Sequence, residues 1–190
     1  ERTVTIAEAF LTFRQATFEH TALDGWHAYN SGIPTLDTTD PYDGDACMLI
    51  EASAGADRGA KTPDAGVTGI TAGNDYSLQA YMKGAAGGET VTLEIAWFTA
   101  ASAYLSSSTQ VVTLTSEWAQ YKLEGATAPA TAEKASVRIH DSADTDWYVD
   151  NVCLEEAATC GDFVTPADAN TRVYNGGDLI CYPVYTCTVT

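Results

Sequence analysis

Apolar and polar residues alternate through the sequence Thr90-Val91-Thr92-Leu93-Glu94-Ile95-Ala96-Trp97-Phe98. In an extended chain, the odd-numbered residues from Val91 to Trp97 share one face and the even-numbered residues share the other. The same period of two runs from Tyr76 to Lys83, where the apolar side carries Tyr76, Leu78, Ala80 and Met82. Both segments are therefore predicted to be half-buried β-strands.

Further short segments of this type follow one another along the chain. They are residues 47–52, 110–115, 119–124, 135–140 and 147–154. Residues 25–44, which contain the turn sequence Asp40-Pro41-Tyr42-Asp43-Gly44, are predicted to form a strand and a long loop, and residues 53–64 a loop of small residues. Because no segment shows a convincing amphipathic helix, we predict an all-β fold, an antiparallel β-sandwich.

Composition limits the classes of partner. A chain of 190 residues is long enough for one sizeable core. Its net charge of -17 argues against nucleic acid, because phosphate binding needs a basic patch. No run of 18 apolar residues occurs, so we predict no membrane insertion.

The cysteines favour an oxidising, extracellular location. Of the 5 in the chain, four fall near the end: Cys153, Cys160, Cys181 and Cys187. We predict disulfides between Cys153 and Cys160 and between Cys181 and Cys187, with Cys47 free and buried. A zinc site is the alternative, although no Cys-x-x-Cys pair or nearby histidine supports it.

Two acidic residues near opposite ends of the sandwich suggest a cation. Glu19 follows Phe18 at the start of a strand, and Asp150 lies in the last strand, where Tyr148, Val152 and Leu154 are expected on one face. A sandwich closed by its first and last strands would bring Glu19 and Asp150 together. Two carboxylates that meet there repel unless a hard cation lies between them, so we predict a structural calcium ion.

Several motifs occur in the order seen in one known family. They are Phe18-Glu19, Gly25-Trp26, residues 44–50 (GDACMLI), residues 76–83 (YSLQAYMK), Glu117-Trp118 and residues 148–152 (YVDNV). Over residues 17–156 the chain resembles the jelly-roll carbohydrate-binding modules of the family four, nine and twenty-two group. The resemblance implies a jelly roll with an N-terminal extension, residues 1–16, and a Cys-containing C-terminal extension, residues 157–190. It also adds the segment around Gly44 and Asp45 to the predicted calcium ligands, through backbone oxygens.

In this family, glycans lie across the concave face of one sheet. If the alternating apolar residues point inward, polar and aromatic side chains on the matching strands point outward. The predicted glycan-binding residues are Gln79, Tyr81, Glu94, Arg138 and His140. Tyr81, with Phe98 as a second ring, would supply the platform for a sugar and the others its hydrogen-bond partners. Alternatively, these side chains only form cross-strand pairs.

The other large aromatic residues are expected mainly in the core. Trp26, Trp97 and Trp118 each lie in or beside an apolar stretch and are predicted to be buried. Trp147 alternates against Tyr148 and is expected either in the core or at the rim of the sheet. Tyr104 is placed on a loop or hairpin, where it would extend a binding site or cap the sandwich.

These features predict a non-catalytic glycan-binding module of an extracellular protein, stabilised by calcium, whose partner is a polysaccharide or surface glycan. No catalytic residue is assigned, because no hydrolase or phosphate-binding motif is present and a glycosidase needs two suitably placed carboxylates. The alternative is a structural, decoration or adhesin subunit of a virion surface or filament. In that case the two extensions would pair with neighbouring subunits.

Overall fold

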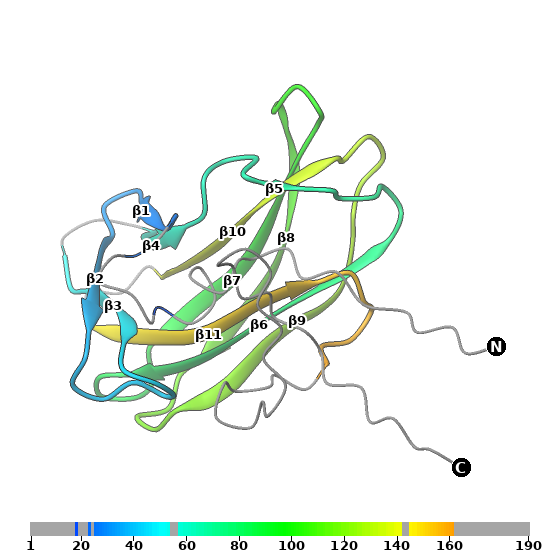
Figure 1. Cartoon of the computed structure of the whole chain (residues 1–190). Coiled ribbons are helices and arrows are strands. Elements are labelled where there is room, and N and C mark those ends of the chain that lie inside the picture. Colours follow the sequence, from blue (N-terminus) through cyan, green and yellow to red (C-terminus); the bar gives the residue numbers. More distant parts are fainter. Residues whose placement is uncertain (1–17, 19–22, 24, 54–56, 142–144, 162–190) are drawn as a thin grey trace, which may run out of the picture.

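The computed structural model describes residues 18, 23, 25–53, 57–141 and 145–161. Within these ranges the chain forms eleven strands and no helix, arranged as two layers (Figure 1). The first layer, the β7 sheet, runs in the order β1 (His27–Tyr29), β4 (Arg58–Lys61), β10 (Lys134–Asp141), β7 (Thr90–Phe98) and β8 (Tyr104–Thr113), with β5 (Val67–Thr68) paired to β10. The second, the β6 sheet, runs β2 (Ile33–Asp37), β3 (Cys47–Glu51), β11 (Trp147–Glu155), β6 (Asp75–Gly84) and β9 (Ala119–Thr127).

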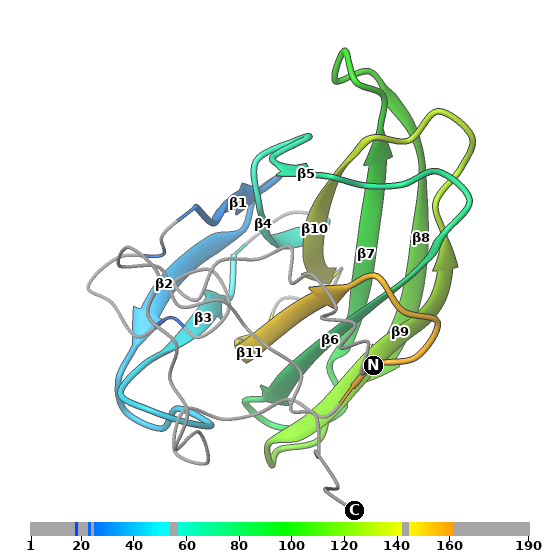
Figure 2. The same ribbon diagram turned by 45° about the vertical axis from the view of Figure 1, so that its right-hand side comes forward.

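All neighbouring strands pair antiparallel, which confirms the predicted sandwich. Figure 2 shows β11, β6 and β9 in one layer and β10, β7 and β8 in the other. β6 and β7 follow each other in sequence but belong to different sheets, so the chain crosses between the layers at residues 85–89. This crossing decides which outward side chains can share a site.

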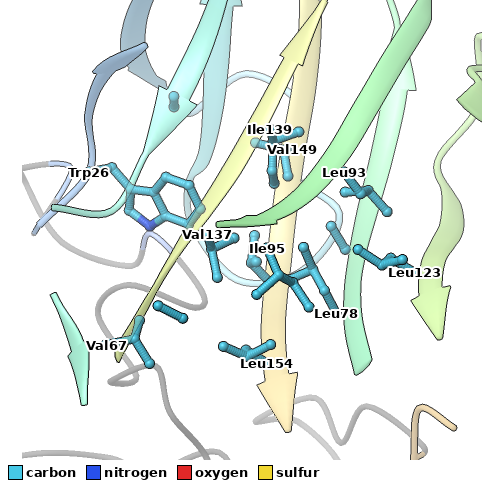
Figure 3. Close-up of a cluster of buried hydrophobic side chains, with 14 of the residues drawn as sticks. Trp26, Val67, Leu78, Leu93, Ile95, Leu123, Val137, Ile139, Val149 and Leu154 are labelled. Carbon is cyan, nitrogen blue, oxygen red and sulfur yellow. The ribbon is translucent and has the colours of Figure 1, made fainter. Parts of the chain in front are cut away.

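The core lies between the two sheets. Leu78 of β6, Ile95 of β7, Val137 of β10 and Val149 of β11 are all fully buried and converge in the same cluster (Figure 3). Leu93 and Trp97 share this inward face of β7, as their alternation predicts. Burial of this apolar area is the main favourable contribution to folding.

Two short strands, β4 and β5, were missed from the sequence. β4 consists of Arg58, Gly59, Ala60 and Lys61, which lack the β-branched and aromatic residues typical of strands. It forms because β1 and β10 pair with it on both sides. The prediction of a loop over residues 53–64 was therefore wrong at Arg58–Lys61, where pairing outweighs intrinsic preference.

The prediction that Tyr148, Val152 and Leu154 share one face of β11 was wrong, because the strand contains a bulge. The register with β6 shifts between Asp150 and Cys153, and Asn151 adopts a left-handed backbone with φ 49°. Val152 and Leu154 are fully buried, whereas Tyr148 lies partly exposed on the opposite side. One additional residue in the strand exchanges the two faces, and simple alternation cannot anticipate this.

The tryptophans divide differently from the prediction. Trp26, Trp97 and Trp147 are buried in the core. Trp118 is only half-buried, and its Nε1 donates to the backbone oxygen of Asp40 at 3.1 Å on the outer side of the β6 sheet. The prediction for Trp118 was wrong because it precedes β9 and packs against the 38–46 loop rather than between the sheets.

The thiols were predicted correctly in part. Cys47 is a free, fully buried thiol, and burial raises its pKa to about 12. Cys160 also carries a free thiol, so the predicted Cys153–Cys160 disulfide is not formed. Burial raises the pKa of Cys160 to about 12, which keeps it protonated and unreactive at neutral pH. Cys181 and Cys187 lie outside the described residues, as do the predicted extension 1–16 and residues 162–190 of the other.

No helix in the described part of the chain is long and apolar enough to cross a membrane.

Candidate functional site

The five predicted glycan-binding residues point outward, but they do not form one site. Gln79 and Tyr81 lie on β6, on the outer face of the β6 sheet. Glu94, Arg138 and His140 lie on β7 and β10, on the outer face of the β7 sheet. The two groups are therefore on opposite sides of the sandwich. Alternation along a strand shows which residues point away from the core, but not which sheet the strand joins.

The outer face of β6 is covered by other parts of the chain. Gln79 is 3% exposed; its Nε2 donates to the backbone oxygen of Gly161 at 3.2 Å, and its Oε1 accepts from Gln120 Nε2 at 2.6 Å. The ring of Tyr81 stacks on Tyr42 with centroids 3.8 Å apart and planes at 14°. A hydrogen bond with Tyr81, together with burial, raises the pKa of Tyr42 to about 12. Tyr81 thus anchors the 38–46 loop through a ring contact made within the chain, and its role as a sugar platform stays a prediction.

More of the 38–46 loop is fastened nearby. Lys83 forms an ion pair with Asp40, and its Nζ lies 5.0 Å from the ring centre of Trp118 and 4.7 Å from that of Tyr148. The ammonium thus lies over two aromatic faces, an arrangement that a desolvated cation finds favourable. These contacts occupy the aromatic surface of the β6 sheet from within the chain.

The outer face of the β7 sheet carries a connected charged network. Arg138 and Glu94 are direct cross-strand partners, with Nη1 and Oε1 3.1 Å apart. The other oxygen of Glu94 lies 3.1 Å from His140 Nε2. Burial opposes ionisation of Glu94, but the hydrogen bond with His140 and the charge of Arg138 outweigh it and hold the pKa of the carboxyl below its usual value. Glu94 is therefore a fixed anion at neutral pH.

Aromatic rings surround this network. The guanidinium carbon of Arg138 lies 5.4 Å from the ring centre of Tyr29 and 5.9 Å from that of Phe98. Tyr29 also packs on His140, with centroids 4.8 Å apart. Phe98 is 4% exposed, but its neighbour Tyr104, 5.8 Å away, is 55% exposed. The rings hold Arg138 in one orientation, and Tyr104 presents an open aromatic surface at the edge of the sheet.

Two residues of this face, Tyr29 and Asp64, were not predicted from the sequence. Tyr29 was missed because its strand, β1, lies in a Gly- and Pro-rich stretch interpreted as strand and long loop. Asp64 was missed because it lies in the turn after β4; its Oδ1 is 3.1 Å from Arg138 Nη2 and its Oδ2 is 2.8 Å from Lys61 Nζ. Hydrogen bonds from Lys61 and Arg138 outweigh burial and lower the pKa of Asp64. Only the register of β4 beside β10 brings these charges together.

The arrangement suits a polyhydroxylated ligand. Sugar rings have apolar C–H faces that pack on aromatic rings, and hydroxyl groups that need fixed donors and acceptors. Tyr104 and Tyr29 provide rings, and Arg138, Glu94 and His140 provide polar groups whose orientation is set before a ligand arrives. Such preorganisation reduces the entropy lost on binding.

The predicted metal ligands are described only in part. Asp150 is fully buried; its Oδ2 accepts from the backbone N–H groups of Tyr42 and Asp43 at 3.1 and 3.2 Å, and its Oδ1 from that of Asn151 at 2.7 Å. Asp45 is exposed on the same loop, and Glu19 lies outside the described residues. Among residues that the structure describes, no three His, Cys, Asp or Glu side chains are grouped to hold a metal ion. Beside Asp150, however, the buried amide of Asn151 has no hydrogen-bond partner on either Oδ1 or Nδ2, which leaves one oxygen of the type calcium takes.

Comparison with solved structures supports the jelly-roll fold. One similar structure contains the CBM22-1 and GH10 modules of the Clostridium thermocellum xylanase Xyn10B in complex with xylohexaose, with a TM-score of 0.62 and 19% identity. It matches 81% of this chain, which spans 29% of that one. Another is the CBM22-1 xylan-binding domain of Paenibacillus barcinonensis Xyn10C, with a TM-score of 0.63, 12% identity and coverage of 83% of this chain and 100% of the other.

A third similar structure comes from a different context. It is the enzymatically active domain of tailspike protein 4 of bacteriophage CBA120, with a TM-score of 0.58 and 13% identity. The match covers 74% of this chain and 20% of the tailspike chain.

No curated protein matched the chain in sequence. The profile of one family, described as "Carbohydrate binding domain", matches residues 12–145, well over half of the chain. The chain therefore belongs to the carbohydrate binding domain family, as its ordered motifs had indicated.

Proposed function

We propose that this chain is a non-catalytic module that binds a polysaccharide on the outer face of the β7 sheet. The observation that carries the proposal is the Arg138–Glu94–His140 network, flanked by the half-buried ring of Tyr29 and the exposed ring of Tyr104. Family membership supports the class of ligand. The similar xylan-binding domains make xylan the first polysaccharide to test.

The acids on this face favour binding over hydrolysis. A glycosidase needs one carboxylic acid that stays protonated near neutral pH to donate to the leaving group. The two acids that contact Arg138, namely Glu94 and Asp64, both have lowered pKa values and are ionised. Neither can act as that acid, and we assign Glu94 to positioning and recognition. A polysaccharide partner also favours the extracellular location inferred from composition.

The test is a polysaccharide screen with matched variants. We expect retention on one polysaccharide class, lost in Arg138→Ala and weakened in Tyr104→Ala. Lys122→Ala and Ile33→Ala remove a charge and an exposed apolar side chain from the β6 sheet, and both should bind like the wild type. Retention that survives Arg138→Ala and Tyr104→Ala together would place the site elsewhere.

We further propose that calcium binds beside Asp150, with Glu19 and backbone oxygens around Asp45 as additional ligands. The buried charge of Asp150 and the unpartnered amide of Asn151 support this. An ion bound only to the folded state at 100 times its dissociation constant would stabilise it by about 2.7 kcal/mol. Calcium should therefore raise the melting temperature of chelator-treated protein, and equilibrium dialysis should find one ion per chain. Asp150→Asn should abolish both effects; their absence in the wild type would remove calcium from the proposal.

The tailspike similarity favours one second candidate, an adhesin or decoration subunit of an extracellular particle. A subunit of that kind would assemble through its own surfaces, including the terminal extensions. Light scattering on the intact chain separates the two functions: a concentration-independent oligomer without polysaccharide retention supports the subunit, and a monomer with retention supports the module. An oligomer that retains polysaccharide would support a glycan-binding adhesin.

A further inference from the structure

A carboxylate of the chain itself lies between two cations on the proposed binding face. Asp64 contacts Lys61 through Oδ2 at 2.8 Å and Arg138 through Oδ1 at 3.1 Å, so each of its oxygens has a cationic partner. The Asp64 side chain is 51% exposed, whereas those of Lys61 and Arg138 are 24% and 13% exposed. The anion thus lies on the solvent side of a pair of cations that is built into β4 and β10.

The contacts of Asp64 are easily replaced. An ion pair with one half-exposed partner contributes only about 0–1 kcal/mol to stability. The turn itself is anchored independently, because Gly66 N donates to Pro63 O at 2.9 Å and Ala65 packs in a small cluster with Ala96 and Phe98. Only the Asp64 side chain would have to rotate away to open the cationic site.

Arg138 retains a donor that Asp64 does not use. A carboxylate can accept from Nε and one Nη of an arginine through two parallel hydrogen bonds. Asp64 contacts Nη2 alone, since its other oxygen is directed to Lys61, and Nε of Arg138 is buried without an acceptor among the described residues. A carboxylate that is not tethered to the turn could satisfy both donors.

The charge distribution is unusual for so acidic a chain. The sequence has 9 Lys and Arg against 26 Asp and Glu. Three of those cations lie on the outer face of the β7 sheet. Lys61 and Arg138 are direct cross-strand partners, and Lys134 is the cross-strand partner of Phe98. A densely charged polyanion would be repelled by the chain as a whole, but single carboxylates spaced along a neutral polymer would meet a local cationic site.

We propose that the polysaccharide carries uronic acid groups and that one uronate displaces Asp64 between Lys61 and Arg138. This inference rests on the proposed function and narrows its ligand class. In the free protein, Asp64 accepts hydrogen bonds from Lys61 and Arg138. In the complex, the carboxylate of the ligand accepts them instead. The uronate gains charge-assisted hydrogen bonds that a neutral sugar cannot form.

The experiment compares ligands that differ only in the carboxyl group. Glucuronoxylan and polygalacturonate are each tested beside their carboxyl-reduced forms, by affinity electrophoresis of the intact chain. We expect glucuronoxylan, whose carboxylates are spaced along a neutral chain, to bind about five- to tenfold more tightly than its reduced form, as one charge-assisted hydrogen bond allows. Polygalacturonate, which carries a carboxylate on every residue, is the densely charged control and should bind no more tightly than its reduced form. Lys61→Ala should abolish that preference without weakening binding to the reduced polymer.

Asp64→Asn provides the sharpest variant, because it removes the competing charge and keeps the shape. It should bind the acidic polymer several-fold more tightly than the wild type and the reduced polymer equally well. Lys122→Ala, which removes a cation from the other sheet as Lys61→Ala does from this one, should change neither. Equal binding of glucuronoxylan and its reduced form, with no effect of Asp64→Asn, would overturn the uronate inference and leave the proposed function intact. Failure to bind these four polymers and every neutral polysaccharide in the screen would overturn both.

Discussion

The two outer faces of this sandwich are built from the same alternating pattern but have different surroundings. On the β6 sheet, outward residues such as Gln79 and Lys83 are nearly buried, because the 38–46 loop and residues 157–161 cover them. On the β7 sheet, Arg138 and Tyr104 both contact Phe98 and remain partly open. Alternation thus identifies residues that leave the core, whereas the connecting segments determine which of them a ligand can reach.

The largest effect on stability should come from the β6 sheet, on removal of the Asp150 carboxylate that binds the 38–46 loop. Asp150→Ala leaves three buried or half-buried backbone N–H groups without their acceptor, and we expect it to lower the free energy of unfolding by about 3–5 kcal/mol. Urea unfolding measures this. Glu133→Ala, which removes an exposed acid just before β10, is the control and should stay within about 0.5 kcal/mol of the wild type. A loss below 1 kcal/mol in Asp150→Ala would mean that the loop is held by other contacts.

The tyrosines of the two faces should respond in opposite ways. Tyr81→Ala removes the ring that stacks on Tyr42, so stability should fall by about 2 kcal/mol while polysaccharide affinity per folded molecule is unchanged. Calorimetric unfolding and titration on the same sample check both halves. A loss of affinity without a loss of stability would support the predicted role of Tyr81 as a sugar platform.

Tyr104→Ala is the mirror of that variant. Its ring is 55% exposed, so unfolding should change by less than about 0.5 kcal/mol, whereas polysaccharide affinity should fall about tenfold as an aromatic contact is lost. Titration calorimetry with the polysaccharide found in the screen measures the affinity, and Ile33→Ala on the other sheet serves as the control. Unchanged affinity would exclude the β8 edge from the site.

The smallest effect concerns pH and the Glu94 network. The folded-state pKa of Glu94 lies below its ordinary value of 4.5, so its ionised form is favoured by folding. The stability that it contributes is therefore fully present above pH 4.5 and is lost as the pH falls through the lower, folded-state value. Glu94→Gln should be about 1 kcal/mol less stable than the wild type at pH 6, and this difference should shrink below pH 4.5.

The control for this titration is Glu117→Gln, an exposed acid outside the network. Its difference from the wild type should stay small and show no such decline in acid. A Glu94→Gln difference that persists at pH 3 would assign the effect to lost packing rather than to lost charge.

Strong periodicity made much of the fold predictable. β6, β7 and β10 were identified from alternation alone, and their inward residues, among them Leu78, Ile95 and Val137, form the core. β4 could not be found, because its residues have little strand preference and pairing with β1 and β10 decides its conformation. The exchange of faces within β11 also depends on a bulge that leaves no periodic signal.

Only part of the candidate site was predictable from the sequence. Glu94, Arg138 and His140 were identified and do contact one another, whereas Gln79 and Tyr81 belong to the other sheet. The error arises at the crossing between β6 and β7, since adjacent strands with the same pattern look like neighbours in one sheet. Tyr29 lies in β1, within a stretch predicted only as strand and long loop, and Asp64 follows the missed strand β4, so neither could be placed beside Arg138 from the sequence.

Gly161 lies on the side of the sandwich opposite the proposed binding face. Its N–H donates to Glu155 and its oxygen accepts from Gln79, so the backbone leaves the described region along the outer side of the β6 sheet. The Arg138 network lies on the reverse side of the sandwich. The contacts of residues 157–161 are thus made on the side opposite the proposed binding face, so they do not compete with a polymer that lies across the β7 sheet.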